Sequence, residues 1–170
     1  MCADTVPYGW RRSAEAGLGF RAISDDDEML FSGRVYVSVR KHYLADLPWS
    51  DVYKAAFLLI QFRAQQSWYE QEYPEADRLL ISRRQQDIGR LYLNRGADEL
   101  RIIDIALLPA HRRKGAGEAV LRDLMDEAAA CGSVLSAEVE KESPALRLFR
   151  RLGFTIAADH GDCNLLRWPG

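Results

Sequence analysis

The chain has 170 residues, 48% of them hydrophobic and 28% charged, and its formal net charge is -2. This length and composition fit one compact domain with a sizeable core, and the near-neutral charge excludes nucleic-acid binding through an overall basic surface. No apolar run approaches the roughly 18 residues of a membrane span and the N-terminal stretch lacks the apolar core of a signal peptide, so we expect a soluble, cytoplasmic protein that binds neither membrane nor nucleic acid.

The N-terminal segments predict an arm, a strand and a helix. Residues 1–16 are interpreted as a flexible arm, and residues 17–170 as a single domain that opens with a short apolar strand over residues 17–24. Ser24 and the acidic residues that follow it indicate the start of a helix, because side-chain oxygens and negative charge satisfy unpaired backbone amides there. This first helix is expected over about residues 26–43.

The middle of the chain predicts a second helix and then three strands. The helix opens at Ser50 or Asp51, which would cap it. The strands are expected over residues 78–84, 88–95 and 99–109, joined by polar turns into a meander. The apolar side of the helix is formed by Ala55, Ala56, Leu59, Ile60 and Phe62.

The third strand is followed by a cationic turn and another helix. Residues 102–108 form a nearly continuous apolar run, as in a strand covered on both faces, and only Asp104 interrupts it. The turn, HRRKGAG, places three cations before two glycines, and apolar residues then recur at helical spacing up to a stop at Gly132. A strand over residues 134–139, a short helix over residues 143–152 and two closing segments complete an α/β chain.

The cationic turn suits a phosphate group. A helix N-terminus presents unpaired amides and about half a positive charge, glycines let a ligand approach the backbone, and Arg112, Arg113 and Lys114 add charge. Two familiar nucleotide motifs do not match. The chain lacks GxxxxGK followed by Ser or Thr, and Val120 stands where a dinucleotide fingerprint needs a third Gly or an Ala.

The turn matches a different pattern. The Arg-x-x-Gly-x-Gly spacing of residues 112–117, after an apolar strand that ends in proline, resembles the acetyl-coenzyme A (acetyl-CoA) signature of the GNAT superfamily of N-acetyltransferases. Residues 143–154, SPALRLFRRLGF, are similar to the family's second motif, a short helix ending in a Leu-Gly-Phe turn. The resemblance covers residues 99–154, and residues 58–74 look like one bacterial branch of the family. It implies a mixed, mostly antiparallel sheet with a splayed central strand pair and helices on both faces.

The resemblance also implies where acetyl-CoA, as cosubstrate, would bind. Backbone groups of Ala106, Leu107 and Leu108 would bond the pantetheine arm, and the amide near Leu107 would stabilise the oxyanion of an attacked thioester. The helix that carries Ser143 and Phe149 would lie beside the thiol. No metal is expected, because the cysteines and histidines show no ligand spacing. The pyrophosphate would be held by the backbone amides of Arg112, Arg113, Lys114, Gly115, Ala116, Gly117 and Glu118.

Two residues depart from the family pattern, and the proton acceptor has two candidates. Phe149 stands where the family usually carries a tyrosine that protonates the departing thiolate, and Ser143 where related sequences often carry asparagine. A carboxylate should take the proton of an amine substrate, and we consider Asp104 and Glu99. Asp104 has the desolvated setting that a base needs, but it is equally well explained as a structural acid paired with an arginine.

The aromatic residues of the N-terminal half leave two interpretations open. They form either the core between the helices or the walls of an acceptor pocket beside the splayed strands. Glu70 or Glu72 near such walls would suit an amine, since rings and carboxylates attract cations. The residues are Tyr36, Tyr43, Trp49, Tyr53, Trp68, Tyr69 and Tyr73.

Together these features predict an enzyme. It would transfer the acetyl group of acetyl-CoA to an amine of a small molecule or peptide, by direct attack in a ternary complex. The alternative is a non-catalytic acyl-CoA-binding sensor or regulatory module, which Phe149 favours. The sequence leaves the acceptor amine, the acyl-chain preference and the formation of a homodimer open.

Overall fold

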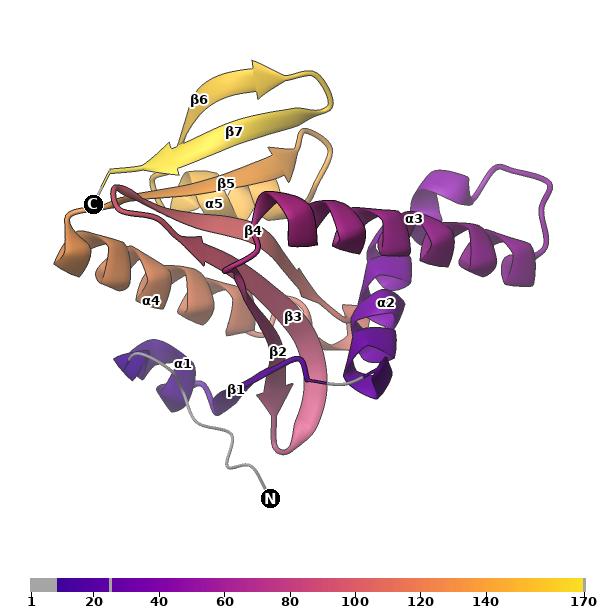
Figure 1. Cartoon of the computed structure of the whole chain (residues 1–170), viewed down its shortest axis with the longest axis horizontal. Helices are drawn as coiled ribbons and strands as arrows, with labels where there is room; N and C mark the ends of the chain where they lie inside the picture. The colour runs from indigo at the N-terminus through magenta and orange to yellow at the C-terminus, as the bar shows by residue number, and fades with distance from the viewer. Residues whose placement is uncertain (1–8, 25, 170) are drawn as a thin grey trace.

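A seven-stranded sheet runs through the protein (Figure 1). The structure is a computed structural model and describes residues 9–24 and 26–169. The strands are β1 (Leu18–Ala22), β2 (Asp77–Arg83), β3 (Gln86–Arg95), β4 (Glu99–Leu107), β5 (Val134–Glu140), β6 (Thr155–His160) and β7 (Cys163–Trp168). Their order across the sheet is β1-β2-β3-β4-β5-β7-β6, and all neighbours are antiparallel except β4 and β5. The mixed, mostly antiparallel sheet expected from the sequence is therefore confirmed.

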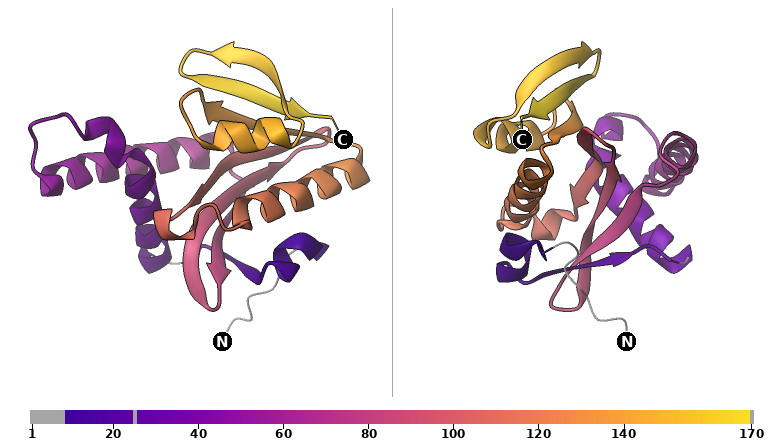
Figure 2. Two further views of the ribbon diagram at one scale, coloured as in Figure 1. Left: turned by 180° about the vertical axis from the view of Figure 1, so that it is seen from behind. Right: turned by 60° about the vertical axis from the view of Figure 1, so that its left-hand side comes forward.

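Helices cover both faces of this sheet. They are α1 (Arg11–Glu15), α2 (Asp26–Arg40), α3 (Asp51–Glu72), α4 (Ala116–Cys131) and α5 (Ala145–Arg151), with two short 3-10 turns, η2 (Lys41–Leu44) and η3 (Pro109–His111). Helices α1, α4 and α5 lie on one face, and α2 and α3 lie on the other (Figure 2). Within the described residues, no helix has both the length and the hydropathy that crossing a membrane requires.

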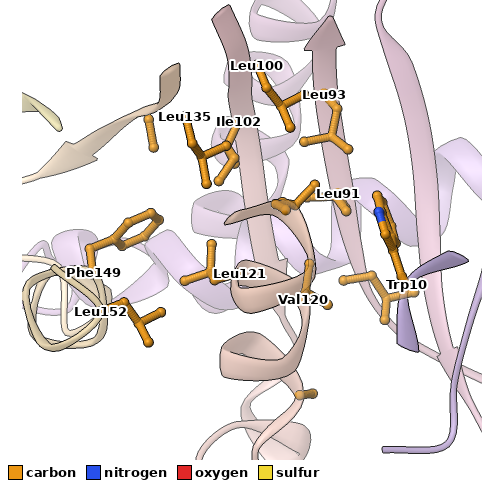
Figure 3. Packing of buried hydrophobic residues seen from close by; sticks show 14 of the residues in the cluster. Trp10, Leu91, Leu93, Leu100, Ile102, Val120, Leu121, Leu135, Phe149 and Leu152 are labelled. Carbon is orange, nitrogen blue, oxygen red and sulfur yellow. The ribbon is translucent and has the colours of Figure 1, made fainter. Parts of the chain in front are cut away.

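The larger hydrophobic core lies between the sheet and helices α4 and α5 (Figure 3). Leu91 and Ile102 from the sheet pack with Val120 and Leu121 from α4 and with Phe149 from α5. The apolar stripe that the sequence predicts on α4 forms this contact, which agrees with its helical spacing. Two smaller clusters lie under α2 and α3 and contain Phe31, Val35, Leu80, Tyr36, Leu58 and Phe62.

Helix α2 matches the sequence in extent, and α3 matches it in its start but only partly in its buried side. Helix α2 ends at Arg40 and η2 continues the turn, close to the expected helix over residues 26–43. Ser50 caps α3, because its Oγ accepts a hydrogen bond from the Tyr53 amide at 3.2 Å. The expected apolar side is wrong for Ala56 and for Ile60, which is 67% exposed, because both point away from the buried stripe of α3. The buried residues of α3 are Leu58, Phe62, Gln66 and Tyr69.

Within the arm expected over residues 1–16, residues 9–16 form α1 and the turn before β1. Asp123 of α4 caps this short helix: its carboxylate accepts hydrogen bonds from the amides of Arg12 at 3.0 Å and Ser13 at 2.7 Å. Trp10 is buried in the same contact. Local sequence could not indicate α1, because its cap comes from a residue more than a hundred positions away. Residues 1–8 lie outside the described residues.

The α1 cap gives a testable expectation for stability. Asp123 is only 3% exposed, so Asp123→Ala leaves two amides without their acceptor in a site that water barely reaches. We expect the free energy of unfolding in urea to fall by about 2 kcal/mol. Hydrogen exchange at the amides of Arg12 and Ser13 should accelerate at the same time. Asp126→Ala is the control, because Asp126 pairs with the side chain of Arg12 at the surface and bonds no backbone amide in the described part of the chain. An equal loss in both variants would contradict the capping role.

Candidate active site

The central parallel strands part halfway along their length. Pairing between β4 and β5 ends at Ile102 and Ala137, although β4 continues to Leu107 and β5 to Glu140. The register with β3 shifts at this point, and Ile103 is the extra residue of the bulge on β4. The splayed central strand pair expected from the resemblance is therefore present, and the two strands leave a gap between them.

The backbone of β4 presents polar groups to this gap. The Leu108 amide donates to the Ile88 carbonyl of β3 at 2.8 Å. Because amide direction alternates along a strand, Ala106 also faces β3, whereas Ile105 and Leu107 face the gap. Of the three predicted pantetheine contacts, only Leu107 therefore directs its amide and carbonyl toward the gap. Sequence reasoning missed Ile105, because the bulge that fixes which amides face the gap is not visible in the sequence pattern.

The cationic turn ends in an uncapped helix start. Gly115 is the N-cap of α4 with φ of 83°, and no side chain caps the helix. The first helical bond runs from the Ala119 amide to the Gly115 carbonyl, at 3.0 Å. The amides of Ala116, Gly117 and Glu118 therefore have no acceptor within the helix. This arrangement can bind an anion, as the sequence predicted, because free amides and the positive end of the helix dipole point the same way.

Side chains around the turn are held in place by the backbone and by ion pairs. Arg112 Nε donates to the Leu107 carbonyl at 2.8 Å, and burial lowers the pKa of its guanidinium. Lys114 Nζ donates to the Ala110 carbonyl at 2.8 Å. Hydrogen bonds from Arg122 and Arg151 lower the pKa of Glu118, so its carboxylate stays ionised on the outside of the turn.

A cavity of about 290 Å³ opens where β4 and β5 separate. Ile105 and Phe149 line it, and so do Glu138 and Glu140 of β5. Of the seven aromatic residues considered from the sequence, four line it from α2, α3 and the C-cap of α3: Tyr36, Trp68, Tyr69 and Tyr73.

The remaining predicted pocket residues do not line this cavity. Trp49 and Tyr53 lie at or near the projecting end of α3 and are exposed. Tyr43, in η2, is also exposed, although its hydroxyl reaches the cavity residue Glu140. Glu70 forms an ion pair with Arg78 at 3.0 Å, outside the cavity lining. Among residues 9–24 and 26–169, no group of three or more His, Cys, Asp and Glu side chains is placed to hold a metal ion.

Three ion pairs join residues that line the cavity. They are Arg90–Asp104 at 2.7 Å, Arg101–Glu138 at 3.4 Å and Arg40–Glu140 at 2.6 Å. The Tyr43 hydroxyl also donates to Glu140, and this hydrogen bond raises the pKa of Tyr43 to about 12. Burial raises the pKa of Tyr69, so this cavity tyrosine stays protonated at neutral pH.

Asp104 is paired with an arginine, the second of its two predicted roles. The Arg90 side chain is 2% exposed and that of Asp104 15%. Arg90 also donates to the Ser32 hydroxyl at 3.1 Å. Burial alone would lower the pKa of Arg90, but Asp104 and the nearby tyrosines raise it overall. If Asp104 took a proton, the buried Arg90 charge would lose its anion, and breaking such a pair costs about 3–5 kcal/mol. The geometry therefore argues against Asp104 as the base.

The other predicted catalytic and motif residues are placed as follows. Glu99 lies at the paired end of β4, 3.9 Å from Arg101, and does not line the cavity. Ser143 lines the cavity, and its Oγ accepts from the Ala145 amide at the start of α5. Phe149 is 1% exposed and packs edge-on against Phe154, so it fills the core beside the gap and offers no proton.

Sequence reasoning missed the two acids of β5. Glu138 and Glu140 belong to the segment VLSAEVE, whose alternation puts them on one face of the strand, opposite Ala137 and Val139. This alternation is a signal that could have placed them together. Their position beside the gap could not be predicted, because the sequence does not indicate where the pairing of β4 and β5 ends.

Comparison with known proteins agrees with this geometry. A sequence profile described as the acetyltransferase (GNAT) family matches residues 39–154. Over 52 residues the chain is 46% identical to the L-methionine sulfoximine/L-methionine sulfone acetyltransferase of Salmonella typhimurium. That match covers 29% of this chain and 30% of the Salmonella protein, so it bears on only part of either.

Solved structures share the fold. PaiA N-acetyltransferase of Thermoplasma acidophilum, in complex with coenzyme A, matches with a TM-score of 0.68 at 15% identity, over 90% of this chain and 99% of that one. An acetyltransferase of Thermus thermophilus matches with a TM-score of 0.63 at 19% identity, over 90% and 97%. The structure of yncA from Salmonella typhimurium with its cofactor acetyl-CoA matches with a TM-score of 0.53 at 21% identity, over 90% and 94%. Since the profile covers more than half of the residues, including the splayed strands and the uncapped helix, the chain belongs to the acetyltransferase (GNAT) family.

Proposed function

We propose that this protein transfers the acetyl group of acetyl-CoA to a primary amine by direct attack in a ternary complex. The observation that carries the proposal is the gap between β4 and β5. It connects an anion-binding turn at one end with a cavity lined by carboxylates and aromatic rings. The two ends suit the two substrates, a polyphosphate ester and a cation.

The residues present fit the coenzyme. The free amides of Ala116, Gly117 and Glu118 would hold the pyrophosphate, and the gap-facing groups of Ile105 and Leu107 would bond the pantetheine. The Leu107 carbonyl accepts a hydrogen bond from Arg112 Nε and has a second lone pair that could accept one from the pantetheine. The thioester would then lie near Ile105 and Phe149, inside the cavity.

The proposed reaction exchanges one bond for another at the thioester carbon. The amine nitrogen forms a C–N bond, the C–S bond breaks, and the amide of Ile105 or Leu107 stabilises the oxyanion. Phe149 cannot protonate the departing thiolate. A thiolate with a pKa near 8.5 leaves unprotonated at neutral pH at a cost of about 2 kcal/mol, which slows the reaction without preventing it.

The cavity lining supports a cationic acceptor, because rings and carboxylates attract ammonium groups. The partly matching Salmonella relative is named for two amino-acid derivatives, so α-amino acids and their sulfone or sulfoximine derivatives are the first compounds to test. Polyamines, aminoglycosides and peptides with a free N-terminus or lysine complete the panel.

The test is a free-thiol release assay with acetyl-CoA and this panel, preceded by calorimetric titration of acetyl-CoA into the protein. We expect micromolar binding and thiol release that depends on the amine. Binding without release on any amine would favour the second candidate function, an acyl-CoA sensor, which the Phe149 side chain supports. Absence of binding would contradict both.

A further inference from the structure

We propose that Glu138 takes the proton of the acceptor amine and that His160 passes this proton to solvent. The inference deepens the proposed function and rests on it. It names a catalytic residue, Glu138, and a positioning and relay residue, His160, neither of which the sequence motifs contain. The observation behind it is a carboxylate–imidazole pair at the opening between β4 and β5.

Glu138 occupies the point where the strands part. Ala137 is the last residue of β5 that pairs with β4, and Glu138 is the next. Its side chain lines the cavity, on the opposite face of β5 from the core residues Ala137 and Val139. A carboxylate at this place lies beside the path along which an amine reaches a thioester held near Ile105.

The contacts of Glu138 hold one oxygen and leave the other for a substrate. Oε1 lies 2.7 Å from His160 Nδ1 and 3.4 Å from Arg101 Nη2. Oε2 accepts no hydrogen bond from any residue in the described ranges 9–24 and 26–169. His160 ends β6, and its side chain is 46% exposed. The pair therefore reaches from the cavity to the surface.

The other cavity acids are bound more firmly. Asp104 is paired with an arginine that is 2% exposed, and Glu140 is held by Arg40 and by the Tyr43 hydroxyl. Glu138, at 40% exposed, has its closest contact with an imidazole, which can itself release a proton. The titratable and charged groups around Glu138 are Arg101 and Asp104 from β4, Glu140 from β5, His160 from β6, Cys163 from β7 and Arg40 from α2.

The proton balance of the step is complete. The acceptor enters as an ammonium ion, gives one proton to Glu138 Oε2, and then attacks the thioester carbon. A second proton leaves the nitrogen as the amide forms and reaches the departing sulfur through water. The protonated carboxyl group of Glu138 then turns its O–H toward His160. In its Nε2–H tautomer the imidazole accepts this proton at Nδ1 and releases the Nε2 proton to bulk solvent, so the net products are the amide, coenzyme A thiol and one released proton.

The test is the pH profile of kcat/KM for the acceptor in Glu138→Gln. We expect a loss of about 100-fold at pH 7, with the Kd of acetyl-CoA unchanged. The loss of kcat/KM should become smaller as the pH rises to about 9.5, because more of the amine is then unprotonated and needs no base. His160→Gly should lose about 10-fold and recover when imidazole is added, since the site is open to solvent. Glu142→Gln, an exposed acid after β5, is the matched control.

Each outcome decides between proposals. If kcat/KM of Glu138→Gln falls by less than roughly 3-fold, or falls equally at every pH, the proton route is overturned. The acetyltransferase proposal stays intact in that case. A wild type that releases no thiol with any amine would instead remove the proposed function, and this inference with it. Unfolding curves of the variants show whether a loss of activity is caused by misfolding. The variant His160→Gln keeps a hydrogen-bond donor but has no titrating group, so it separates positioning of Glu138 from proton transfer.

Discussion

Gly117→Asp is expected to abolish acetyl-CoA binding while leaving α4 as stable as before. Gly117 is the second residue of the helix, where a carboxylate bonds the free amides and interacts favourably with the helix dipole. There is room for it, because a Cβ at this position would lie 3.6 Å from Leu148, an ordinary contact. The same carboxylate occupies the place of the pyrophosphate and repels it. We expect the Kd to rise at least about 100-fold, or roughly 2.7 kcal/mol.

The measurement pairs calorimetric titration of acetyl-CoA with thermal unfolding of the unliganded protein. Ala130→Asp provides the control, since Ala130 is exposed near the other end of the same helix. It should lower the melting temperature slightly, because negative charge is unfavourable at a helix C-terminus, and leave binding intact. The two variants thus predict opposite patterns. Unchanged binding in Gly117→Asp would place the pyrophosphate elsewhere.

The coenzyme side of the site was largely predictable because its signals are local. Gly115 and Gly117 are separated by one residue, follow a cationic segment and precede an apolar stripe, so the sequence predicts strand, turn and helix together. The structure confirms the uncapped helix start that these residues imply. The contact atoms on β4 were less predictable, because the bulge at Ile103 changes which amides face the gap.

The acceptor side was poorly predictable because its contacts join distant segments. Glu138 of β5 meets His160 of β6 because the sheet order β5-β7-β6 separates these two strands by only one strand. Helix α1, on the other face of the sheet, was unpredictable for the same reason, because its cap comes from Asp123 of α4. Arg90 and Asp104 pair across β3 and β4, and the sequence suggested an arginine partner for Asp104 without identifying which one. Such side-chain pairing depends on the order and register of the strands in the sheet, which the sequence alone does not predict.

The Arg90–Asp104 pair gives the second large expected effect. Arg90→Met should lower the free energy of unfolding by about 3–5 kcal/mol, because it leaves a carboxylate in a poorly hydrated site without its cation. Asp104→Leu should do the same by leaving the buried guanidinium unpaired. The double variant should recover at least half of the loss, since two apolar side chains need no partner. Urea unfolding at pH 7 measures all three, and purely additive losses would contradict the pairing. If the double variant also retains amine-dependent thiol release, Asp104 holds the strands together and the proton is taken by another group.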